Sequence, residues 1–345
     1  MLAVTQPQPL RAALKQLIDG HNLDAATMRE CMMAIMSGQA APEQIAAFLI
    51  ALRIKGERPH EIAEAAAVMR ELAHGLAIDT DGLTDIVGTG GDGASLFNVS
   101  TASAFVAAAA GVRMAKHGNR AVSSRSGAAD LLEVAGCRLD LNADEASILI
   151  DELGIAFLFA PMHHPAMKHA IGPRKALGVR TLFNLLGPLT NPALAPNQVL
   201  GVFSPSLVEP MAQVMQQLGC RHVMVVHGAG GLDEISLSGP TQVAELCDGQ
   251  IRHYEVEPEA LGVRQQALDS LTAATPIDSL MLVKQALNGE PGAATDMVAL
   301  NAGAAIYVSG LTNSHADGVA LAQQVMAKQA PMRRFQTYIE RSHAP

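Results

Sequence analysis

The sequence contains no tryptophan and few other aromatic residues, with three tyrosines and eight phenylalanines among 345 residues. Hydrophobic residues still make up 49% of the chain, so the core must be built from Ala, Leu, Val, Ile and Met. That composition favours helices packed on a parallel sheet over a β-sandwich. The length allows a sizeable core, either in one large α/β domain or in two lobes.

Charged residues are also scarce, at 17%, and 33 acidic residues outnumber 24 basic ones, which gives a formal net charge of −9. A chain with this charge repels polyanions on average, so the composition argues against a general nucleic-acid-binding protein. A small anionic ligand would need a local basic site.

Cysteine pairs and long apolar runs are missing as well. The four cysteines form no C-x-x-C pair, which predicts reduced structural thiols and neither disulfides nor a zinc site; they are Cys31, Cys137, Cys220 and Cys247. No basic region followed by an apolar run opens the chain, and no uncharged apolar stretch approaches the ~20 residues of a membrane span. We therefore expect a soluble cytoplasmic protein without a membrane partner.

Residues 1–77 show helical periodicity and no strand pattern, which predicts four short helices forming a small helical lobe. Asp24 is a candidate N-cap, and Pro42 suits the first turn of a helix. Three of the predicted helices end at glycines, namely Gly20, Gly38 and Gly56.

Beyond this lobe, short apolar strands alternate with glycine-containing loops and helices. The pattern predicts a mainly parallel central sheet flanked by helices, with ligands at the carboxyl ends of its strands. The expected division is an α/β lobe formed by residues 78–164 and 193–345, with the irregular segment 165–192 returning to the helical lobe. The fold class is therefore α/β with a small all-helical lobe.

A glycine-rich loop, "GTGGDG", follows the first predicted strand. Its Gly88-x-Gly90-x-x-Gly93 spacing is that of a dinucleotide fingerprint, which requires an acidic residue about 20 positions later. No Asp or Glu occurs between Gly93 and Ala129, and Asp92 would repel a metal-free pyrophosphate. The dinucleotide interpretation is therefore disfavoured.

The same loop suits another phosphate ligand, because glycine N–H groups and a helix start near Ser100 can approach phosphate oxygens. Asn98 and Thr101 add hydrogen-bond donors there. Asp92 is useful in such a cradle if it holds a sugar hydroxyl or hydrated Mg²⁺. The pattern indicates a sugar phosphate or a pyrophosphate with metal, and a simple helix N-cap after a flexible turn is the alternative.

Two further strand-end loops support this interpretation. The loop "KHGNRAVSS" supplies donors and no acid, namely Lys116, His117, Asn119, Arg120, Ser123 and Ser124. In "AGGLDEIS", Asp233 and Glu234 can jointly bind hydrated Mg²⁺. An exposed turn is the alternative interpretation of that acidic pair.

Six motifs in this order resemble the anthranilate phosphoribosyltransferase family of tryptophan biosynthesis: "GTGGD", "NVSTA", "KHGNRAVSS", "HPAMKHA", "RTLFNLLGPLTNP" and "GLDEIS". The helical opening resembles that family's N-terminal lobe. The resemblance implies transfer of a phosphoribosyl group from phosphoribosyl pyrophosphate (PRPP) to the amine of anthranilate. It also implies Mg²⁺, with two ions per active site, and a homodimer joined through the helical lobes.

Matching motifs carry the family's functional residues onto this chain. The PRPP-binding residues implied are Gly88, Thr89, Gly90, Gly91, Asp92, Leu96, Asn98, Ser100, Thr101, Lys116, Gly118, Asn119, Arg120, Ser123, Ser124 and Ala128. The anthranilate-binding residues implied are Gly88, His117, Asn119, His164, Arg174, Gly187 and Pro188. The implied metal ligands are Ser100, Asp233 and Glu234, and the catalytic candidates are Lys116 and His117.

Two features depart from the family pattern, namely the glycine-rich "GAGGLDE" around the acidic pair and one position in the first loop. Family members often have Thr or Ser where this chain has Leu96, so a hydroxyl contact to PRPP is either absent or moved to Ser95.

The implied chemistry needs little acid–base help, because an arylamine is already unprotonated at neutral pH. His117 could accept the proton late or only orient the substrate. The fork of Arg174 can pair with the anthranilate carboxylate. Two alternatives are a pyrimidine nucleoside phosphorylase and a non-catalytic nucleic-acid-binding relative of the same fold. The acidic pair and the net charge argue against the second.

Overall fold

The computed structural model describes residues 9–121 and 125–345, and the chain divides into two compact units. The helical unit comprises Met1–His74 and His164–Thr190, and the α/β unit comprises Gly75–His163 and Asn191–Pro345. The segment after His163 therefore belongs with the N-terminal helices. The boundaries expected from the sequence, at residues 77, 164 and 192, stand beside observed boundaries at 74, 163 and 190.

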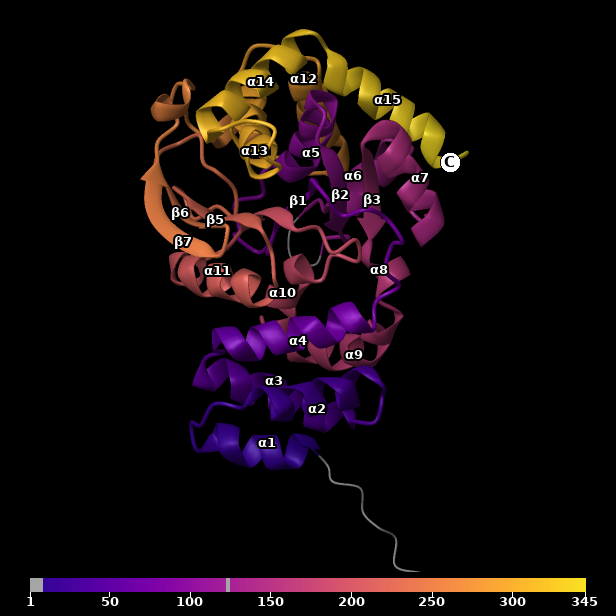
Figure 1. Ribbon diagram of the computed structural model, residues 1–345, viewed down its shortest axis with the longest axis vertical. Coiled ribbons are helices and arrows are strands. Elements are labelled where there is room, and N and C mark those ends of the chain that lie inside the picture. Colours follow the sequence, from indigo (N-terminus) through magenta and orange to yellow (C-terminus); the bar gives the residue numbers. More distant parts are fainter. Residues whose placement is uncertain (1–8, 122–124) are drawn as a thin grey trace, which may run out of the picture. The chain divides into compact units, whose positions relative to one another are not determined.

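The helical unit contains six α-helices among its described residues (Figure 1): α1 (Pro9–Ile18), α2 (Ala25–Met36), α3 (Pro42–Lys55), α4 (Pro59–Glu71), α9 (Lys168–Leu177) and α10 (Leu182–Leu186). Two 3-10 turns, η1 (Pro165–Met167) and η2 (Gly187–Leu189), flank the last two helices. Asp24 caps α2 by accepting a 2.8 Å hydrogen bond from the Thr27 N–H. Pro42 occupies the first turn of α3. Both predicted helix starts are confirmed.

Seven strands form the sheet of the α/β unit, in the order β3-β2-β1-β4-β5-β6-β7. Their bounds are β1 (Leu83–Gly88), β2 (Arg113–Gly118), β3 (Ile155–Phe159), β4 (Asn197–Gly201), β5 (His222–Gly228), β6 (Thr241–Cys247) and β7 (Gln250–Val256). The first five strands are parallel, and β6 and β7 are antiparallel. The predicted fold class, a helical lobe with a mainly parallel α/β lobe, is confirmed.

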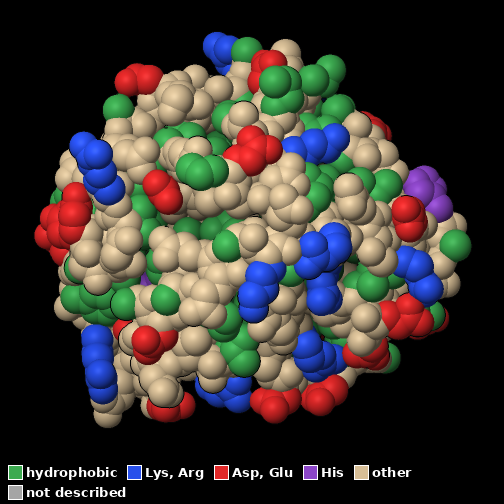
Figure 2. All heavy atoms as spheres, turned by 90° about the horizontal axis from the view of Figure 1, so that it is seen from above, with side chains coloured by type: hydrophobic (Ala, Val, Ile, Leu, Met, Phe, Trp, Pro, Cys, Tyr) green, Lys and Arg blue, Asp and Glu red, His purple; other side chains and the backbone are tan. Residues whose placement is uncertain are grey.

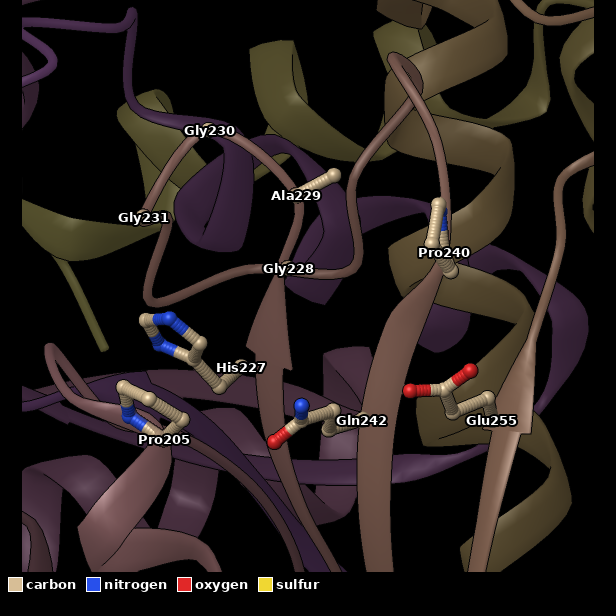
Figure 3. A pocket seen from close by; sticks show the side chains of 9 residues that line it. All are labelled: Pro205, His227, Gly228, Ala229, Gly230, Gly231, Pro240, Gln242 and Glu255. Atoms are coloured by element: carbon tan, nitrogen blue, oxygen red, sulfur yellow. The ribbon is translucent and has the colours of Figure 1, made fainter.

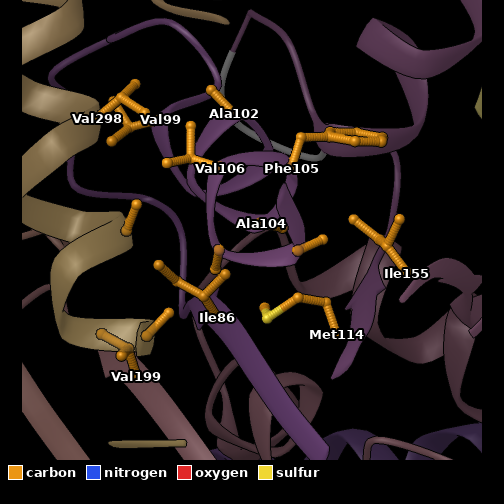
Figure 4. Close-up of a cluster of buried hydrophobic side chains, with 14 of the residues drawn as sticks. Ile86, Val99, Ala102, Ala104, Phe105, Val106, Met114, Ile155, Val199 and Val298 are labelled. Atoms are coloured by element: carbon orange, nitrogen blue, oxygen red, sulfur yellow. The ribbon is translucent and has the colours of Figure 1, made fainter. Parts of the chain in front are cut away.

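Helices cover the sheet on both faces (Figure 1). The helices of this unit are α5 (Val99–Ala110), α6 (Ala128–Val134), α7 (Ala143–Leu153), α8 (Ala160–His163), α11 (Val208–Gln217), α12 (Pro276–Leu287), α13 (Ala293–Val308), α14 (His315–Ala327) and α15 (Ala330–Ser342). Three 3-10 turns, η3 (Pro205–Leu207), η4 (Glu259–Leu261) and η5 (Asp269–Leu271), complete the unit. Helix α5 is the central element, and its Val106 and Phe105 lie near Ile86 of β1 and Met114 of β2 (Figure 4).

The core is built as the composition requires, because small and aliphatic side chains dominate it. The few aromatic residues gather at one point, where the ring of Phe105 meets Phe335 and Tyr338 edge-on at 4.8 and 5.5 Å. These two contacts attach α15 to α5. The four cysteines are free.

Two further observations concern the exterior. No helix within the described part of the chain is both long and apolar enough to cross a membrane. The face in Figure 2, to which α12, α14 and α15 contribute, mixes Lys and Arg with Asp and Glu side chains.

Candidate active site

The first glycine loop leaves the carboxyl end of β1 and is attached to β4. The Thr89 N–H donates to the Gly201 carbonyl at 2.9 Å, and the Thr89 hydroxyl accepts from the Phe203 N–H at 3.1 Å. Gly90, Gly91 and Gly93 have φ angles of 69°, 76° and 79°. Residues with a side chain rarely adopt this left-handed backbone conformation, so the turn itself requires glycine.

The position of Asp233 explains why glycine is needed at the ends of β1 and β4. A Cβ atom on Gly88 would lie 2.2 Å from Asp233 Oδ2, and one on Gly201 would lie 1.6 Å from the Asp233 carbonyl oxygen. Neither distance is sterically possible. The loop carrying the acidic pair is therefore packed directly onto these strand ends, as expected for loops at the carboxyl edge of a parallel sheet.

Three acids converge at this position. Asp233 Oδ2 accepts a 2.6 Å hydrogen bond from the Gly90 N–H. The Asp92 carboxyl group lies near that of Asp233 and interacts with it electrostatically. Burial, and then the charge of Asp92, raise the pKa of Asp233 to about 6. Burial and Asp233 raise the pKa of Glu234 well above its usual value, although Lys116 opposes them.

These shifts mean that the negative charge of the acids is not fully neutralised by the protein. Asp233 is only 9% exposed, so the alternative of an ordinary exposed turn is wrong. In the described residues, no group of three or more His, Cys, Asp or Glu side chains is arranged to hold a metal directly. The carboxyl oxygens of the acidic pair are ligands of the kind that Mg²⁺ accepts.

The start of α5 supplies hydrogen-bonding groups beside the acids. The Ser100 backbone faces Glu234 and acts to lower the pKa of that carboxyl group. The Thr101 hydroxyl is buried and has no hydrogen-bond partner among the described residues. An unsatisfied hydroxyl at a helix N-terminus favours binding of a polar or anionic ligand.

The side chain of Asn98 is instead occupied within the protein. Its Oδ1 accepts from the hydroxyls of Ser126 (2.8 Å) and Ser279 (2.7 Å), and its Nδ2 donates to the Ser126 carbonyl at 3.3 Å. These bonds hold the loop before α6 and the helix α12 next to the start of α5. The expected contact from Asn98 to PRPP stays a prediction.

Lys116 and His117 lie on β2, and both are buried, at 3% exposure. Lys116 Nζ donates to the Ile86 carbonyl at 2.7 Å. Burial lowers the pKa of Lys116, while Asp85 and Glu234 act in the opposite direction. The structure thus brings the predicted catalytic lysine close to an acid of the predicted metal loop.

In the second loop, the positive charge of Arg120 is already paired with acids of the protein. Arg120 forms an ion pair with Glu133 at 2.7 Å and with Asp130 at 3.2 Å, both on α6. Its guanidinium also lies 5.7 Å from the centre of the Phe159 ring. Asn119 Oδ1 accepts from the Arg120 N–H at 2.7 Å. The stretch from Gly93 to Ala129, which contains no Asp or Glu, ends just before these two acids.

The remaining residues predicted for PRPP are placed as follows. A Cβ on Gly118 would lie 2.8 Å from Phe157 and 3.3 Å from Ala128, so this glycine permits close packing of β2 against α6. Leu96 forms an isolated bridge with Thr272, and its side chain packs against the core. Ser123 and Ser124 lie outside the described residues.

The helical unit carries four of the residues predicted for anthranilate: His164, Arg174, Gly187 and Pro188. Arg174 is half-buried on α9, 5.2 Å from the Phe183 ring centre, and burial lowers its pKa. No carboxylate in the described chain forms an ion pair with it. An Arg without an acid can pair with a substrate carboxylate. Gly187 begins η2, and its carbonyl accepts from the Thr190 hydroxyl at 3.1 Å.

A hollow of about 280 Å³ lies elsewhere on the α/β unit (Figure 3), lined by Pro205, His227, Gly228, Ala229, Gly230, Gly231, Pro240, Gln242 and Glu255. His227, Gln242 and Glu255 are neighbours across β5, β6 and β7. None of these nine residues is Lys or Arg, and one is an acid. The hollow is therefore unsuited to a polyphosphate, and it contains no residue predicted for the site.

Asp85 was not among the residues predicted from the sequence. It is fully buried in β1, and its Oδ1 accepts from the His117 N–H at 3.2 Å. Burial raises its pKa to about 6, while Lys116 acts to lower it. A charged residue inside an otherwise apolar strand, "LTDIVG", was the signal that could have identified it.

Comparison with known proteins agrees with this arrangement over almost the whole chain. Residues 80–330 match the glycosyl transferase family a/b domain, and residues 11–73 match the helical bundle domain of that family. The anthranilate phosphoribosyltransferase of Chromohalobacter salexigens is 55% identical over 326 residues, covering 94% of this chain and 95% of the relative.

Solved structures agree as well. The crystal structure of anthranilate phosphoribosyltransferase from Thermus thermophilus has a TM-score of 0.91 at 46% identity, covering 96% of this chain and 99% of that one. The enzyme from Saccharomyces cerevisiae in complex with PRPP and Mg has a TM-score of 0.89 at 27% identity, covering 99% of both chains. This chain therefore belongs to the anthranilate phosphoribosyltransferase family.

Proposed function

We propose that the protein transfers the 5-phosphoribosyl group of PRPP to the amine of anthranilate, releasing pyrophosphate, in tryptophan biosynthesis. The observation that carries the proposal is the group of Asp92, Asp233 and Glu234, packed on the glycine ends of β1 and β4. The yeast relative, whose structure contains PRPP and Mg, supports this proposal.

Asp233 and Glu234 fit Mg²⁺ on the chemistry of the chain itself, because burial and neighbouring acids raise their pKa values and a bound cation would offset that cost. Asp233 and Glu234, with Ser100, would hold the metal, and the sequence resemblance predicts two ions. When bound, Mg²⁺ neutralises charge on the pyrophosphate leaving group.

The protein's own groups have a defined task in this reaction. Breaking the bond between ribose C1 and pyrophosphate builds negative charge on the leaving group and positive charge on the ribose ring. The Lys116 ammonium and the unpartnered Thr101 hydroxyl are suited to stabilise the leaving group. Asp92 is suited to the ribose or to the hydrated metal. Alignment and charge stabilisation then account for most of the catalysis.

The acceptor requires recognition more than activation, since its arylamine is neutral at physiological pH. Arg174 would pair with its carboxylate, because the guanidinium has no acid partner in the described chain. His117 either accepts the amine proton or orients the substrate. The residues predicted for anthranilate are divided between the units, with Gly88, His117 and Asn119 in the α/β unit and the other four in the helical unit.

A fluorescence assay of anthranilate consumption, with PRPP and Mg²⁺, tests the proposal directly. We expect loss of anthranilate fluorescence that requires both PRPP and Mg²⁺ and stops when EDTA is added. Absence of turnover under these conditions would refute the assignment. Phosphorolysis of thymidine or uridine would instead indicate the phosphorylase alternative. A salt-dependent gel shift without transferase activity would indicate the nucleic-acid-binding one.

We also propose that the protein acts in the cytoplasm as a homodimer joined through its helical unit, as the sequence resemblance implies. Large apolar side chains exposed on this unit support the proposal: Ile18 is 76% exposed, Ile54 82% and Ile171 55%. Sedimentation equilibrium should give twice the 36.1 kDa of one chain, and Ile54→Asp should shift it toward the monomer. A monomeric wild-type protein would contradict the proposal.

A further inference from the structure

Strand β1 is paired very differently with its two neighbours. It pairs with β4 along its length, from Thr84↔Asn197 to Gly88↔Gly201. With β2 it pairs only at Leu83↔Arg113 and Thr84↔Met114, although β2 continues to pair with β3 as far as Gly118. The ladder between β1 and β2 therefore stops before the strand ends that carry the first two loops. Buried backbone groups beyond this point need other partners.

Three buried side chains provide those partners. Asp85 Oδ1 accepts from the His117 N–H at 3.2 Å. Asn191 Nδ2 donates to the Ala115 carbonyl at 2.7 Å, and Lys116 Nζ donates to the Ile86 carbonyl at 2.7 Å. Asp85, Asn191 and Lys116 are 0%, 4% and 3% exposed. Side chains thus replace the missing ladder and keep β1 and β2 apart without leaving these polar groups unsatisfied.

The three side chains form one connected group. Asn191 Nδ2 also donates to Asp85 Oδ2 at 2.8 Å, and its Oδ1 accepts from the Ala193 N–H at 2.9 Å. The charge of Asp85 favours the charged form of Lys116. Asn191 is the first residue of the α/β unit after the segment His164–Thr190. The point where the chain re-enters this unit is thereby tied to β1.

The chemistry of the surrounding groups requires an acceptor at position 85. Its carboxylate accepts from an amide NH₂ and from a backbone N–H, and the Lys116 ammonium acts on it through its charge. A carboxylate suits all three groups, whereas an Asn side chain would place its own NH₂ against one of the two donors. Burying a charge is costly, so packing alone would favour a neutral residue here.

We propose that Asp85, together with Asn191, is a positioning residue for the transfer reaction. The pair spans the gap between β1 and β2 and fixes the backbone of Ala115 and His117 on either side of Lys116, the residue whose ammonium would bind the pyrophosphate of PRPP. This inference rests on the proposed function, because that function supplies the ligand for Lys116.

The test compares Asp85→Asn and Asn191→Ser with Asn197→Ser. Asn197 is a matched control because it is a fully buried amide that donates to β1, at the Leu83 carbonyl (3.3 Å), but at the other end of the strand. Four quantities are measured in each protein: PRPP affinity by calorimetry with Mg²⁺, the Michaelis constants for PRPP and for anthranilate, and the rate of hydrogen exchange of the His117 amide.

We expect Asp85→Asn to weaken PRPP binding and raise the KM for PRPP by about tenfold or more, because the backbone around Lys116 loses an anchor and the ammonium loses a nearby negative charge. The KM for anthranilate should change by less than about threefold, as for a contact not made by that substrate. Exchange of the His117 amide should become faster. Asn191→Ser should act in the same direction more weakly, and Asn197→Ser should leave PRPP affinity unchanged.

Two results would overturn the inference. One is unchanged PRPP affinity in folded Asp85→Asn and Asn191→Ser. The other is an equal loss of affinity in Asn197→Ser, which would indicate general loosening of the sheet. If Asp85→Asn does not fold, Asn191→Ser decides the question alone. Wild-type protein that does not bind PRPP would refute the proposed function itself, and this result is distinct from the other two.

Discussion

Each unit of the molecule buries a lysine beside acids, and the two groups differ in how well their charges are balanced. In the helical unit, Lys55 Nζ lies 2.6 Å from Glu61 Oε2, with side chains 4% and 0% exposed. Glu61 also accepts from the N–H groups of Leu23 and Arg58, both at 2.8 Å. One positive and one negative charge are paired there, and hydrogen bonds satisfy the carboxylate.

In the α/β unit, Lys116 lies among acids that outnumber it. Asp85, Asp233 and Glu234 all have raised pKa values. The pair in the helical unit is complete by itself and stabilises the fold. The acids of the α/β unit are destabilised by their surroundings, which is characteristic of a site that binds a cation or substrate. Charge balance therefore separates the pair in the helical unit from the group that we propose to bind the cation and the substrate.

The largest effect should come from neutralising the acids of the α/β unit. Asp233→Asn combined with Glu234→Gln should lower kcat by roughly 10³-fold, since preorganised charge contributes this much at single sites, and should weaken the dependence on Mg²⁺. The fold should stay intact. Steady-state kinetics over a Mg²⁺ titration checks this, and unchanged activity at limiting Mg²⁺ would refute the metal assignment.

Breaking the pair in the helical unit should have the opposite character. Lys55→Met leaves the Glu61 charge buried without its cation, so we expect a loss of about 3 kcal/mol in the free energy of unfolding. The folded fraction should keep its PRPP affinity. Urea denaturation measures the loss, with Lys15→Met at an exposed site of α1 as the control. A large change in PRPP affinity would show that this pair is not purely structural.

Asp85 should give a distinctive pH dependence. Its folded pKa of about 6 lies above the ordinary value of 3.8, so its contribution to stability is present below about pH 4 and lost as pH rises through 6. From pH 4 to 7, the free energy of unfolding of the wild type should fall by about 1 to 3 kcal/mol relative to Asp85→Asn. A constant difference across this range would contradict the prediction.

Glu245→Gln provides a control of opposite sign. Burial raises the Glu245 pKa, but hydrogen bonds from His222, Tyr307 and Tyr254 outweigh it and leave the pKa lowered. Its stabilising contribution is therefore present above the unfolded pKa and lost as pH falls. Urea denaturation gives the free energy of unfolding of the wild type relative to each variant. As pH rises, this difference should fall for Asp85→Asn and rise for Glu245→Gln.

The smallest effect should come from the other notable cation of the helical unit. Arg174→Ala should raise the KM for anthranilate by roughly tenfold, the value of one charge-assisted pair, with little change in the KM for PRPP. Lys175→Ala, its exposed neighbour on α9, should change neither constant. An equal effect of Arg174→Ala on both constants would count against a role in recognising the acceptor.

Local patterns predicted much of the fold, because apolar periodicity and glycine positions report directly on buried helices and strands. The hairpin of β6 and β7 was not predicted, since most residues of β7 are exposed and its sequence, "QIRHYEV", has no continuous apolar run. Helix α7 was missed as well. So was α15, whose sequence "APMRRFQTYIERS" is strongly polar. It is held largely by Phe335 and Tyr338, and their partner Phe105 is more than 200 positions away in the sequence.

Some features of the candidate site could be predicted from the sequence, and others could not. The glycines and acids of its loops could be identified from the sequence because each motif is short and contiguous. The ion pairs of Arg120 with α6 and the hydrogen bonds of Asn98 to Ser126 and Ser279 could not. These contacts depend on which loops meet at the sheet edge. Asn191 was overlooked for the same reason, since its partner Asp85 is 106 positions away.

The sequence by itself determined the fold class, the family and the chemical type of the site, because these depend on composition, periodicity and short motifs. Only the tertiary structure decided the charge balance around Lys116, the packing of Asp233 against Gly88 and Gly201, and the gap between β1 and β2. The physical reason is that pKa values and steric exclusion depend on distance and burial in three dimensions. Residues far apart in the chain set both.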